Sequence, residues 1–327
     1  MDNGLGQLGG REPTRVVVIT CAVLETEVEH FVRSCPQVLH VEKLRQGLHN
    51  DPPRLRRELQ EAVDRVEQQV PKAEVIVLGY GLCSRGTEEV CTRRCRMVIP
   101  RAHDCITLLL GDRRRYADYV RQQPGTYWYS PGWNRHHVPP GPQRYETLHK
   151  QYVERYGEDN AEYLMSAEQH WFNTYNRATY VDLGVGATPE DLTFTRACAD
   201  WLHWQMDHQH GDAELLRTLL TGPWDDERFL VLAPGQSLTM TADPDRIIRA
   251  VQRAPALACN GCAATACGGK ATAEIVPPPT PIRSGAGDIA GYGCPSATGE
   301  PAVTSSSPSQ QRPVDAAVTP APGENPP

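Results

Sequence analysis

Short apolar runs that are rich in β-branched residues alternate with polar segments along the first third of the chain. Residues 15–20, 74–78 and 97–100 are three such runs, and each is bounded by glycine, proline or polar residues. Runs of this length are typical of buried strands, and their unbroken apolar character favours a parallel sheet covered on both faces. We therefore predict a buried strand at each run.

Helical spacing fills the segments between these strands. Residues 24–32 carry apolar side chains at helical intervals, and Pro36 ends the pattern. Residues 38–44 predict a second strand, and Asp51 followed by two prolines predicts the start of a long helix. The β-α-β-α-β alternation predicts an α/β fold, with a mainly parallel, Rossmann-like sheet flanked by helices.

The middle of the chain continues this alternation. An aromatic run at residues 126–130 and a β-branched run at 177–182 predict strands, whereas residues 106–122 and 189–206 predict helices. The pattern is compatible with two lobes, divided near residues 140–175, and with a single extended sheet.

Composition divides the chain into three parts. After Pro255, alanine, glycine, proline, serine and threonine dominate, and such a segment buries too little apolar surface to offset its ordering entropy. We expect a flexible N-terminus over residues 1–14, an α/β domain over 15–253, and a disordered tail rich in Cys, Pro and Ala over 254–327.

Charge and cysteine content narrow the functional class. The net charge of −7 argues against a nucleic-acid-binding protein, whose binding surface would be basic. No apolar run approaches the ~20 residues that a membrane span needs, and the polar N-terminus does not resemble a signal peptide. Eleven cysteines without a secretion signal indicate thiols or metal ligands in the cytoplasm rather than a disulfide framework.

Chemically active side chains follow three of the predicted strands. Cys21, Cys83 and the pair His103 and Cys105 each come just after a strand end. In open α/β sheets ligands bind outside the carboxyl ends of the strands. We predict that Cys21, Cys83, Cys105 and His103 bind zinc or an iron–sulfur cluster. The alternative is that these cysteines are small buried residues with no ligand.

A second kind of chemistry fits some of the same residues. Cys105 could act as a nucleophile with His103, although the usual base comes from elsewhere in the fold. His49 follows the second strand and is either a fourth ligand, a base or a structural histidine.

The loop after the third strand suggests contact with an anion. Gly79 and Gly81 would let the backbone approach a ligand closely, and Arg85 and Arg101 could pair with an anionic small molecule. The loop lacks the Gly-Lys-Ser/Thr ending of a phosphate-binding Walker loop. Two surface arginines on a tight loop are the simpler alternative.

Two further groups of candidate ligands carry weaker signals. The histidines near residues 203–210 do not match the HExxH zinc motif, so we expect them to be solvated. The tail holds a CxxC half-site at Cys259 and Cys262, and Cys267 and Cys294 follow further along. The half-site is either part of an accessory metal site or an exposed redox-sensitive segment.

Several segments in consistent order resemble one protein family. Residues 46–50, 79–83, 100–106, 124–127 and 130–133 together resemble the domain-of-unknown-function 1638 family of bacteria and archaea. The resemblance covers roughly residues 16–234. It implies no established activity and no catalytic residue. Some members of the family are encoded beside genes for corrinoid-dependent methyl transfer. The resemblance therefore implies metal or cofactor chemistry, with a corrinoid or methyl-transfer protein as partner.

Together these observations favour a metal- or iron–sulfur-binding protein that acts on a small anionic molecule or in corrinoid and methyl-transfer metabolism. A metal-free cysteine-nucleophile enzyme and a non-catalytic carrier of a metal or cofactor are the alternatives. The sequence leaves open whether the protein is an enzyme.

Overall fold

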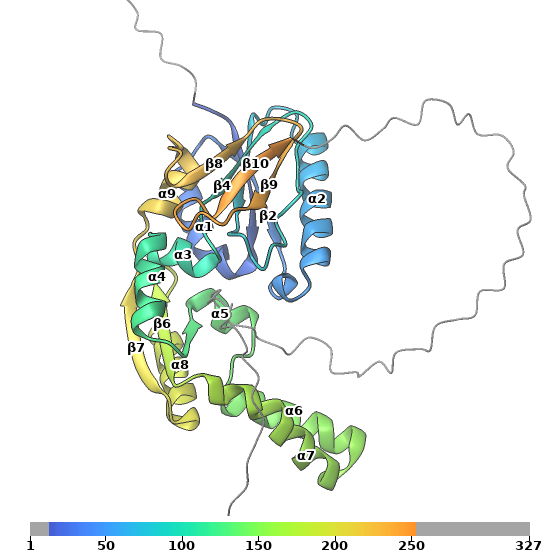
Figure 1. Ribbon diagram of the computed structural model, residues 1–327, viewed down its shortest axis with the longest axis vertical. Helices are drawn as coiled ribbons and strands as arrows, with labels where there is room; N and C mark the ends of the chain where they lie inside the picture. The colour runs from blue at the N-terminus through green and yellow to red at the C-terminus, as the bar shows by residue number, and fades with distance from the viewer. Residues whose placement is uncertain (1–12, 253–327) are drawn as a thin grey trace, which may run out of the picture. The chain divides into compact units, whose positions relative to one another are not determined.

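The first sheet is built from the predicted apolar runs. The structure, a computed structural model, describes residues 13–252 (Figure 1). Five strands form this sheet in the order β2-β1-β3-β4-β8, in which the first four are parallel and β8 is antiparallel to β4. Their bounds are β1 Val16–Cys21, β2 Val38–Leu44, β3 Val75–Gly79, β4 Arg96–Pro100 and β8 Phe229–Leu232. The predicted α/β class with a mainly parallel, helix-flanked sheet is confirmed.

Helices cover both faces of this sheet. On one face α2 (Pro52–Gln69) buries its apolar stripe, and the hairpin of β9 (Gln236–Met240) and β10 (Ile248–Gln252) packs into the same core. Asp51 caps α2 by accepting a hydrogen bond from the Arg54 amide at 3.1 Å, as the sequence predicted. On the other face lie α1 (Glu25–Val32), α3 (Cys105–Leu110) and α9 (Glu214–Thr221).

A second, three-stranded parallel sheet lies between β4 and β8 in the sequence. Its order is β5-β6-β7, with bounds Thr126–Tyr129, Arg177–Asp182 and Gln205–His210. Aromatic side chains form its core, and Tyr129 and Tyr180 are almost completely buried there. The remaining helices are α4 Arg113–Gln122, α5 Pro131–His136, α6 Pro142–Tyr156, α7 Glu158–Gln169 and α8 Pro189–Leu202. Short 3-10 turns are η1 Ala22–Leu24, η2 Leu48–Asn50 and η3 His170–Thr174.

Two predicted helices are wrong in their extent. The helix expected over residues 106–122 is broken into α3 and α4 at Gly111, whose φ of +82° is left-handed. The helix expected over 189–206 stops at Leu202, because His203 also adopts a left-handed conformation, and β7 follows.

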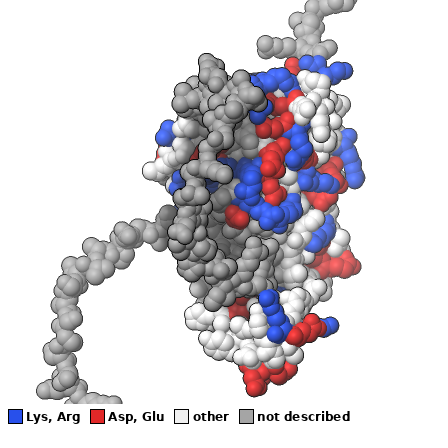
Figure 2. Space-filling view, turned by 90° about the vertical axis from the view of Figure 1, so that its right-hand side faces the viewer, with Lys and Arg blue, Asp and Glu red and all other residues white. Residues whose placement is uncertain are grey.

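Surface charges and apolar helices can be described for residues 13–252. Lys and Arg side chains lie beside Asp and Glu side chains on the face shown in Figure 2, rather than forming one continuous basic surface. Within residues 13–252 no helix is both long enough and apolar enough to span a bilayer. The predicted N-terminal segment, apart from its last two residues, and the predicted tail with Cys259, Cys262, Cys267 and Cys294 lie outside the described residues.

Candidate functional site

Strand register sets Cys21 beside Tyr80. In the β1–β3 pair Thr20 lies opposite Gly79, so the next position on each strand places Cys21 level with Tyr80. The Thr20 hydroxyl donates to the Gly79 carbonyl at 3.3 Å and fixes this end of the pair. Cys21 is half-buried, whereas Tyr80 is only 3% exposed.

Backbone hydrogen bonds join the loop after β3 to the loop after β4. The Leu82 amide donates to the Ala102 carbonyl at 2.8 Å, and the Cys83 amide donates to the His103 carbonyl at 2.9 Å. Gly81 permits this approach, because a Cβ atom there would lie 2.5 Å from the amide nitrogen of Asp104. The two loops that carry Cys83, His103 and Cys105 are therefore neighbours.

The backbone around Cys83 is strained. Cys83, Ser84 and Arg85 adopt φ values of +46°, +54° and +67°, which are unfavourable for residues with a Cβ. Arg85, the last of these three residues, pairs with the buried carboxylate of Glu88 at 3.0 Å. The same carboxylate accepts a hydrogen bond from the Met240 amide at 2.8 Å. Strain of this kind is found where the surrounding structure holds a loop in a functional geometry.

Cys105 opens α3 directly after its N-cap. The Asp104 carboxylate accepts hydrogen bonds from the Ile106 and Thr107 amides at 3.0 and 3.3 Å, and from the Tyr116 hydroxyl at 3.0 Å. Burial raises the pKa of Asp104, and these donors oppose that shift. Burial also raises the pKa of the Cys105 thiol well above its usual value, and the charges of Asp104, Cys21 and Cys83 add to the effect.

Tyr80 and the three thiols interact electrostatically with one another. Burial raises the pKa of Cys21 to about 11, although the Val23 amide and the Tyr80 hydroxyl offset part of the shift. Burial and the charges of Cys21, Cys83 and Cys105 raise the pKa of Tyr80. The Tyr80 hydroxyl has no hydrogen-bond partner of good geometry. The structure thus brings the three predicted cysteines together around a buried phenol that the sequence analysis did not single out.

The two predicted histidines lie differently. His103 is exposed at the edge of this group, with its ring centroid 6.4 Å from that of Tyr116. His49 is half-buried, its ring centroid is 6.0 Å from that of Trp133 on α5, and burial lowers its pKa. The contacts of His49 are therefore with the aromatic side chains of α5.

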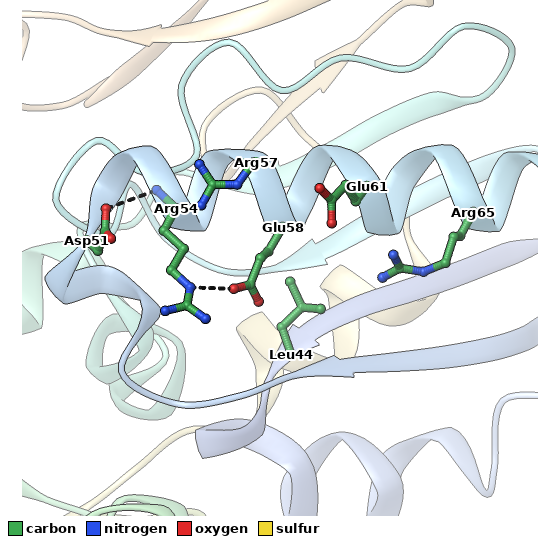
Figure 3. Close-up of a pocket in the computed structure, with 7 residues that line it drawn as sticks. All are labelled: Leu44, Asp51, Arg54, Arg57, Glu58, Glu61 and Arg65. Carbon is green, nitrogen blue, oxygen red and sulfur yellow. Dashed lines mark hydrogen bonds and ion pairs between the residues drawn. The ribbon is translucent and has the colours of Figure 1, made fainter. Parts of the chain in front are cut away.

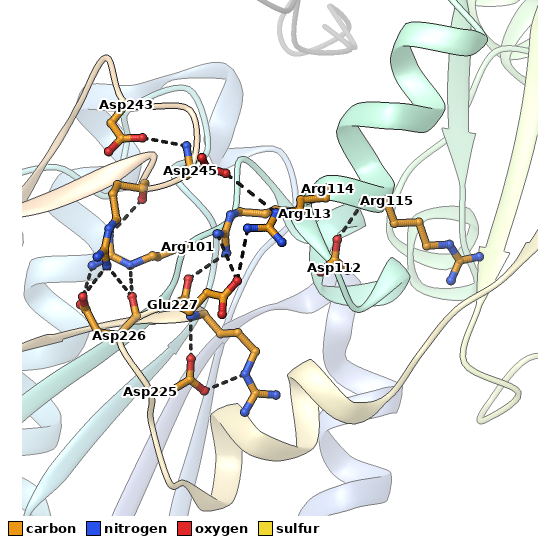
Figure 4. Close-up of polar contacts among 12 residues, drawn as sticks. Arg101, Asp112, Arg113, Arg114, Arg115, Asp225, Asp226, Glu227, Asp243 and Asp245 are labelled. Atoms are coloured by element: carbon orange, nitrogen blue, oxygen red, sulfur yellow. Dashed lines mark hydrogen bonds and ion pairs between the residues drawn. The ribbon is translucent and has the colours of Figure 1, made fainter.

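Arg101 is part of an internal network rather than of the thiol group. Its guanidinium is buried and donates to the Asp226 carboxylate at 2.8 Å, to the Asp226 carbonyl at 2.9 Å and to the Arg246 carbonyl at 3.0 Å (Figure 4). It also donates to the Ile248 carbonyl. These partners account for Arg101, so we do not retain it as an anion-binding residue. Arg85 is exposed, and its side chain pairs with Glu88 at 3.0 Å.

A groove of about 570 Å³ borders the thiol group on the α2 side. Leu44, which lines it, is the register partner of Cys21, and Glu58, which also lines it, contributes to the raised pKa of Tyr80. Figure 3 shows Arg54, Arg57 and Arg65 projecting from α2 along this groove with two carboxylates between them. Leu44 is thus the residue that links this groove to Cys21.

A second group of ligands was missed by the sequence analysis. Asp182, His208 and His210 lie at the carboxyl ends of β6 and β7, and one ligand atom from each falls within 4.8 Å of the others. The histidines were expected to be solvated because residues 203–208 do not match the HExxH motif. The alternation of His208 and His210 was the available signal, since residues two apart on a strand share one face.

Comparison with known proteins identifies a family and no characterised relative. The family model described as "Protein of unknown function (DUF1638)" matches residues 43–220. The matched residues include the loops after β3 and β4 and the ends of β6 and β7, but start after Cys21. No curated protein and no solved structure is significantly similar to the chain.

Proposed function

Since this chain belongs to the DUF1638 family of proteins of unknown function, we propose a function from the site alone. The protein binds a thiolate-ligated metal centre at Cys21, Cys83 and Cys105 and presents it to a small anionic molecule. One observation carries the proposal: the register of β1 with β3 and the hydrogen bonds between the loops after β3 and β4 bring thiols from three adjacent strand ends to the buried hydroxyl of Tyr80.

The spacing of the thiols favours an iron–sulfur cluster over mononuclear zinc. Thiolates that bind one zinc at about 2.3 Å lie roughly 4 Å apart in tetrahedral geometry. Among the described residues, Cys21, Cys83 and Cys105 do not form a group whose ligand atoms all fall within 4.8 Å. Thiolates on different irons of one cluster are farther apart, and three cysteines leave one iron of a four-iron cluster for His103 or an exogenous ligand.

The charge of the site supports a cationic occupant. Burial raises the pKa of Cys21 to about 11, and burial with the charges of Asp104, Cys21 and Cys83 raises that of Cys105 well above its usual value, so both are thiols at neutral pH without a cation. A metal ion deprotonates the thiols that coordinate it. A metal-free nucleophile instead requires a lowered thiol pKa, so these shifts disfavour that alternative.

The topology supports a ligand site at the same edge. We propose that the parallel part of the first sheet is a Rossmann-like, doubly wound sheet, since its order β2-β1-β3-β4 changes direction between β1 and β3. Ligands bind at such a switch point, and Cys21 and Tyr80 lie there. We keep the cytoplasm as the proposed compartment, where thiols stay reduced, and a corrinoid or methyl-transfer protein as the proposed partner on the family resemblance alone.

The groove beside α2 is the proposed entry for the substrate. Arg57 is exposed and lines it, and guanidinium groups pair bidentately with carboxylates and phosphates. The neighbouring Glu58 and Glu61 limit how much negative charge the groove accepts. A small, singly charged anion fits this balance better than a polyanion.

The experiment is anaerobic purification followed by metal analysis and ultraviolet–visible spectroscopy. We expect stoichiometric iron with broad visible absorbance in the unaltered protein, and loss of both in Cys21→Ala, Cys83→Ala and Cys105→Ala. Cys198→Ala, a buried cysteine in the core of the second sheet, is the matched control and should keep the spectrum. A protein that stays free of iron after reconstitution with iron and sulfide would overturn the proposal.

A further inference from the structure

A histidine–carboxylate group lies at the edge of the second sheet. β6 and β7 are parallel with Asp182 opposite His210, and His208 and His210 share one face of β7. The Nε2 atom of His208 lies 2.8 Å from Oδ2 of Asp182, and the two imidazole centroids are 4.4 Å apart. Asp182 is buried, whereas His208 is half-buried and His210 is exposed.

A buried carboxyl group without a partner lies beside this group. Glu27 on α1 is completely buried, and neither of its carboxyl oxygens has a hydrogen-bond partner. Its charge and that of Asp182 are close enough to oppose each other. An isolated buried carboxylate is strongly unfavourable, so the position requires an explanation.

The surrounding contacts hold Glu27 next to the loop that follows β6. Arg135 donates to the Thr26 hydroxyl at 2.8 Å and to Asp191 at 3.1 Å, and it also donates to the Gly186 carbonyl. The first turn of α1 is thereby joined through Arg135 to Gly186 in that loop and to Asp191 on α8. Arg135 forms its ion pair with Asp191, and its charge offsets part of the rise that burial causes in the pKa of Glu27.

The Tyr180 hydroxyl gives a further unpartnered polar group in the same region. Tyr180 is 1% exposed, its hydroxyl has no hydrogen-bond partner, and its ring centroid is 5.3 Å from that of His208. Two buried polar groups without a protein hydrogen-bond partner, on Glu27 and Tyr180, therefore lie beside this convergent set of ligands.

We propose that Asp182, His208 and His210 bind a divalent transition-metal cation, whose charge the buried carboxyl group of Glu27 helps to balance. Two imidazoles with a carboxylate are typical ligands for zinc, iron(II) and cobalt(II), whereas magnesium and calcium prefer oxygen ligands alone. The nitrogen and oxygen donors distinguish this ion from the proposed thiolate centre. The site does not depend on that centre, because it uses none of the three cysteines.

Cobalt(II) titration of the full-length, chelator-treated protein tests this proposal. Cobalt(II) replaces zinc at such sites and absorbs visible light, and thiolate ligands add intense sulfur-to-cobalt bands in the near ultraviolet that nitrogen and oxygen ligands lack. We expect about one equivalent of cobalt to bind without these sulfur bands. His210→Ala and Asp182→Asn should remove that equivalent.

The control and a milder variant keep the test decisive. His40→Ala removes an exposed histidine of β2 and should leave cobalt binding unchanged. Glu27→Gln keeps the shape of the side chain and should weaken binding roughly 10- to 100-fold, which remains measurable if the alanine variant does not fold. Cobalt bound only with sulfur bands, or equal binding by the unaltered protein, His210→Ala and Glu27→Gln, would overturn the proposal.

Discussion

At the scale of single residues, the thiols of Cys21, Cys83 and Cys105 lie at one edge of the sheet, whereas the partners of Arg101 come from distant parts of the chain. Cys21, Cys83 and Cys105 follow apolar runs, and parallel strands bring such positions to one edge. Tyr80 carried no signal, because an aromatic residue after a strand is common. Arg101 was interpreted as an anion-binding residue. Its partner Asp226 lies 125 residues away in the sequence, and no local pattern reveals such a contact.

Replacement of Arg101 separates its structural role from anion binding. Arg101→Ala removes a buried guanidinium and leaves the carbonyl groups of Arg246 and Ile248 without their donor. We expect the free energy of unfolding to fall by about 2–4 kcal/mol, as for other buried polar networks. Urea denaturation measures this. Arg85→Ala, at an exposed ion pair, should change stability by less than about 0.5 kcal/mol; equal stability of the two variants would contradict the structural role.

Gly81 tests the contact between the two loops. A methyl group at this position would meet the backbone of residues 102–104 at less than 3 Å, and backbone cannot move aside easily. Gly81→Ala should therefore destabilise the protein by about 1–3 kcal/mol and separate Cys83 from Cys105. The melting temperature and the iron content report the two effects. Gly184→Asn is the control, since nothing lies within 4 Å of its Cβ and asparagine tolerates its left-handed backbone; an unaltered iron content in Gly81→Ala would show that the loop contact is not required.

At the level of elements, periodicity identified the strands of the first sheet and failed where polar residues form a strand. Residues 205–210 are Gln-Met-Asp-His-Gln-His, which lack the β-branched residues that predict strands. They are a strand because β6 provides a pairing partner along their whole length. Similarly, the break between α3 and α4 depends on the single left-handed residue Gly111, which helical periodicity does not reveal.

His137, which directly follows α5, gives the protein a predicted sensitivity to acid. Burial, with the charges of Arg144 and His49, lowers the pKa of His137 to about 4. An unfolded histidine titrates near 6.5, so between these values the unfolded chain binds more protons than the folded one. The contribution of His137 to stability is therefore complete above about pH 6.5 and falls by roughly 3 kcal/mol as the pH approaches 4. The pKa of His49 is also lowered, which adds a loss of the same sign. Glu27, whose pKa burial raises to about 7, contributes a change of opposite sign between about pH 7 and 4.5.

Urea denaturation at several pH values between about 7 and 4 measures this loss. His137→Gln removes this titrating group, so this variant should lose less stability towards pH 4 than the unaltered protein does. His30→Gln, at an exposed histidine on α1, is the control and should retain the full slope. A slope that is identical in His137→Gln and the unaltered protein would assign the acid sensitivity to other residues.

For the molecule as a whole, the second sheet is connected to the helices of the first at several points. The Asp212 amide donates to the Leu109 carbonyl of α3 at 3.1 Å, and His136 at the end of α5 lies 3.0 Å from Glu25 of α1. Such connections join residues far apart in the sequence, so the sequence predicted the α/β class but left open whether there were one or two sheets. They also explain how Glu27 of α1 comes to lie beside Asp182 of β6.

The proposed cation would add one more connection of this kind, and Glu27→Gln tests it through stability. Without metal, Glu27 is a buried acid with no partner, and the neutral amide removes the penalty for burying its charge. At about pH 8 with a chelator, Glu27→Gln should therefore unfold at a higher temperature than the unaltered protein. With cobalt(II) in excess the order should reverse, because a ligand that binds only the folded state stabilises it in proportion to its affinity. Differential scanning calorimetry under both conditions measures this reversal; an order that is the same with and without cobalt would mean that Glu27 takes no part in holding the ion and that α1 is not linked to β6 through it.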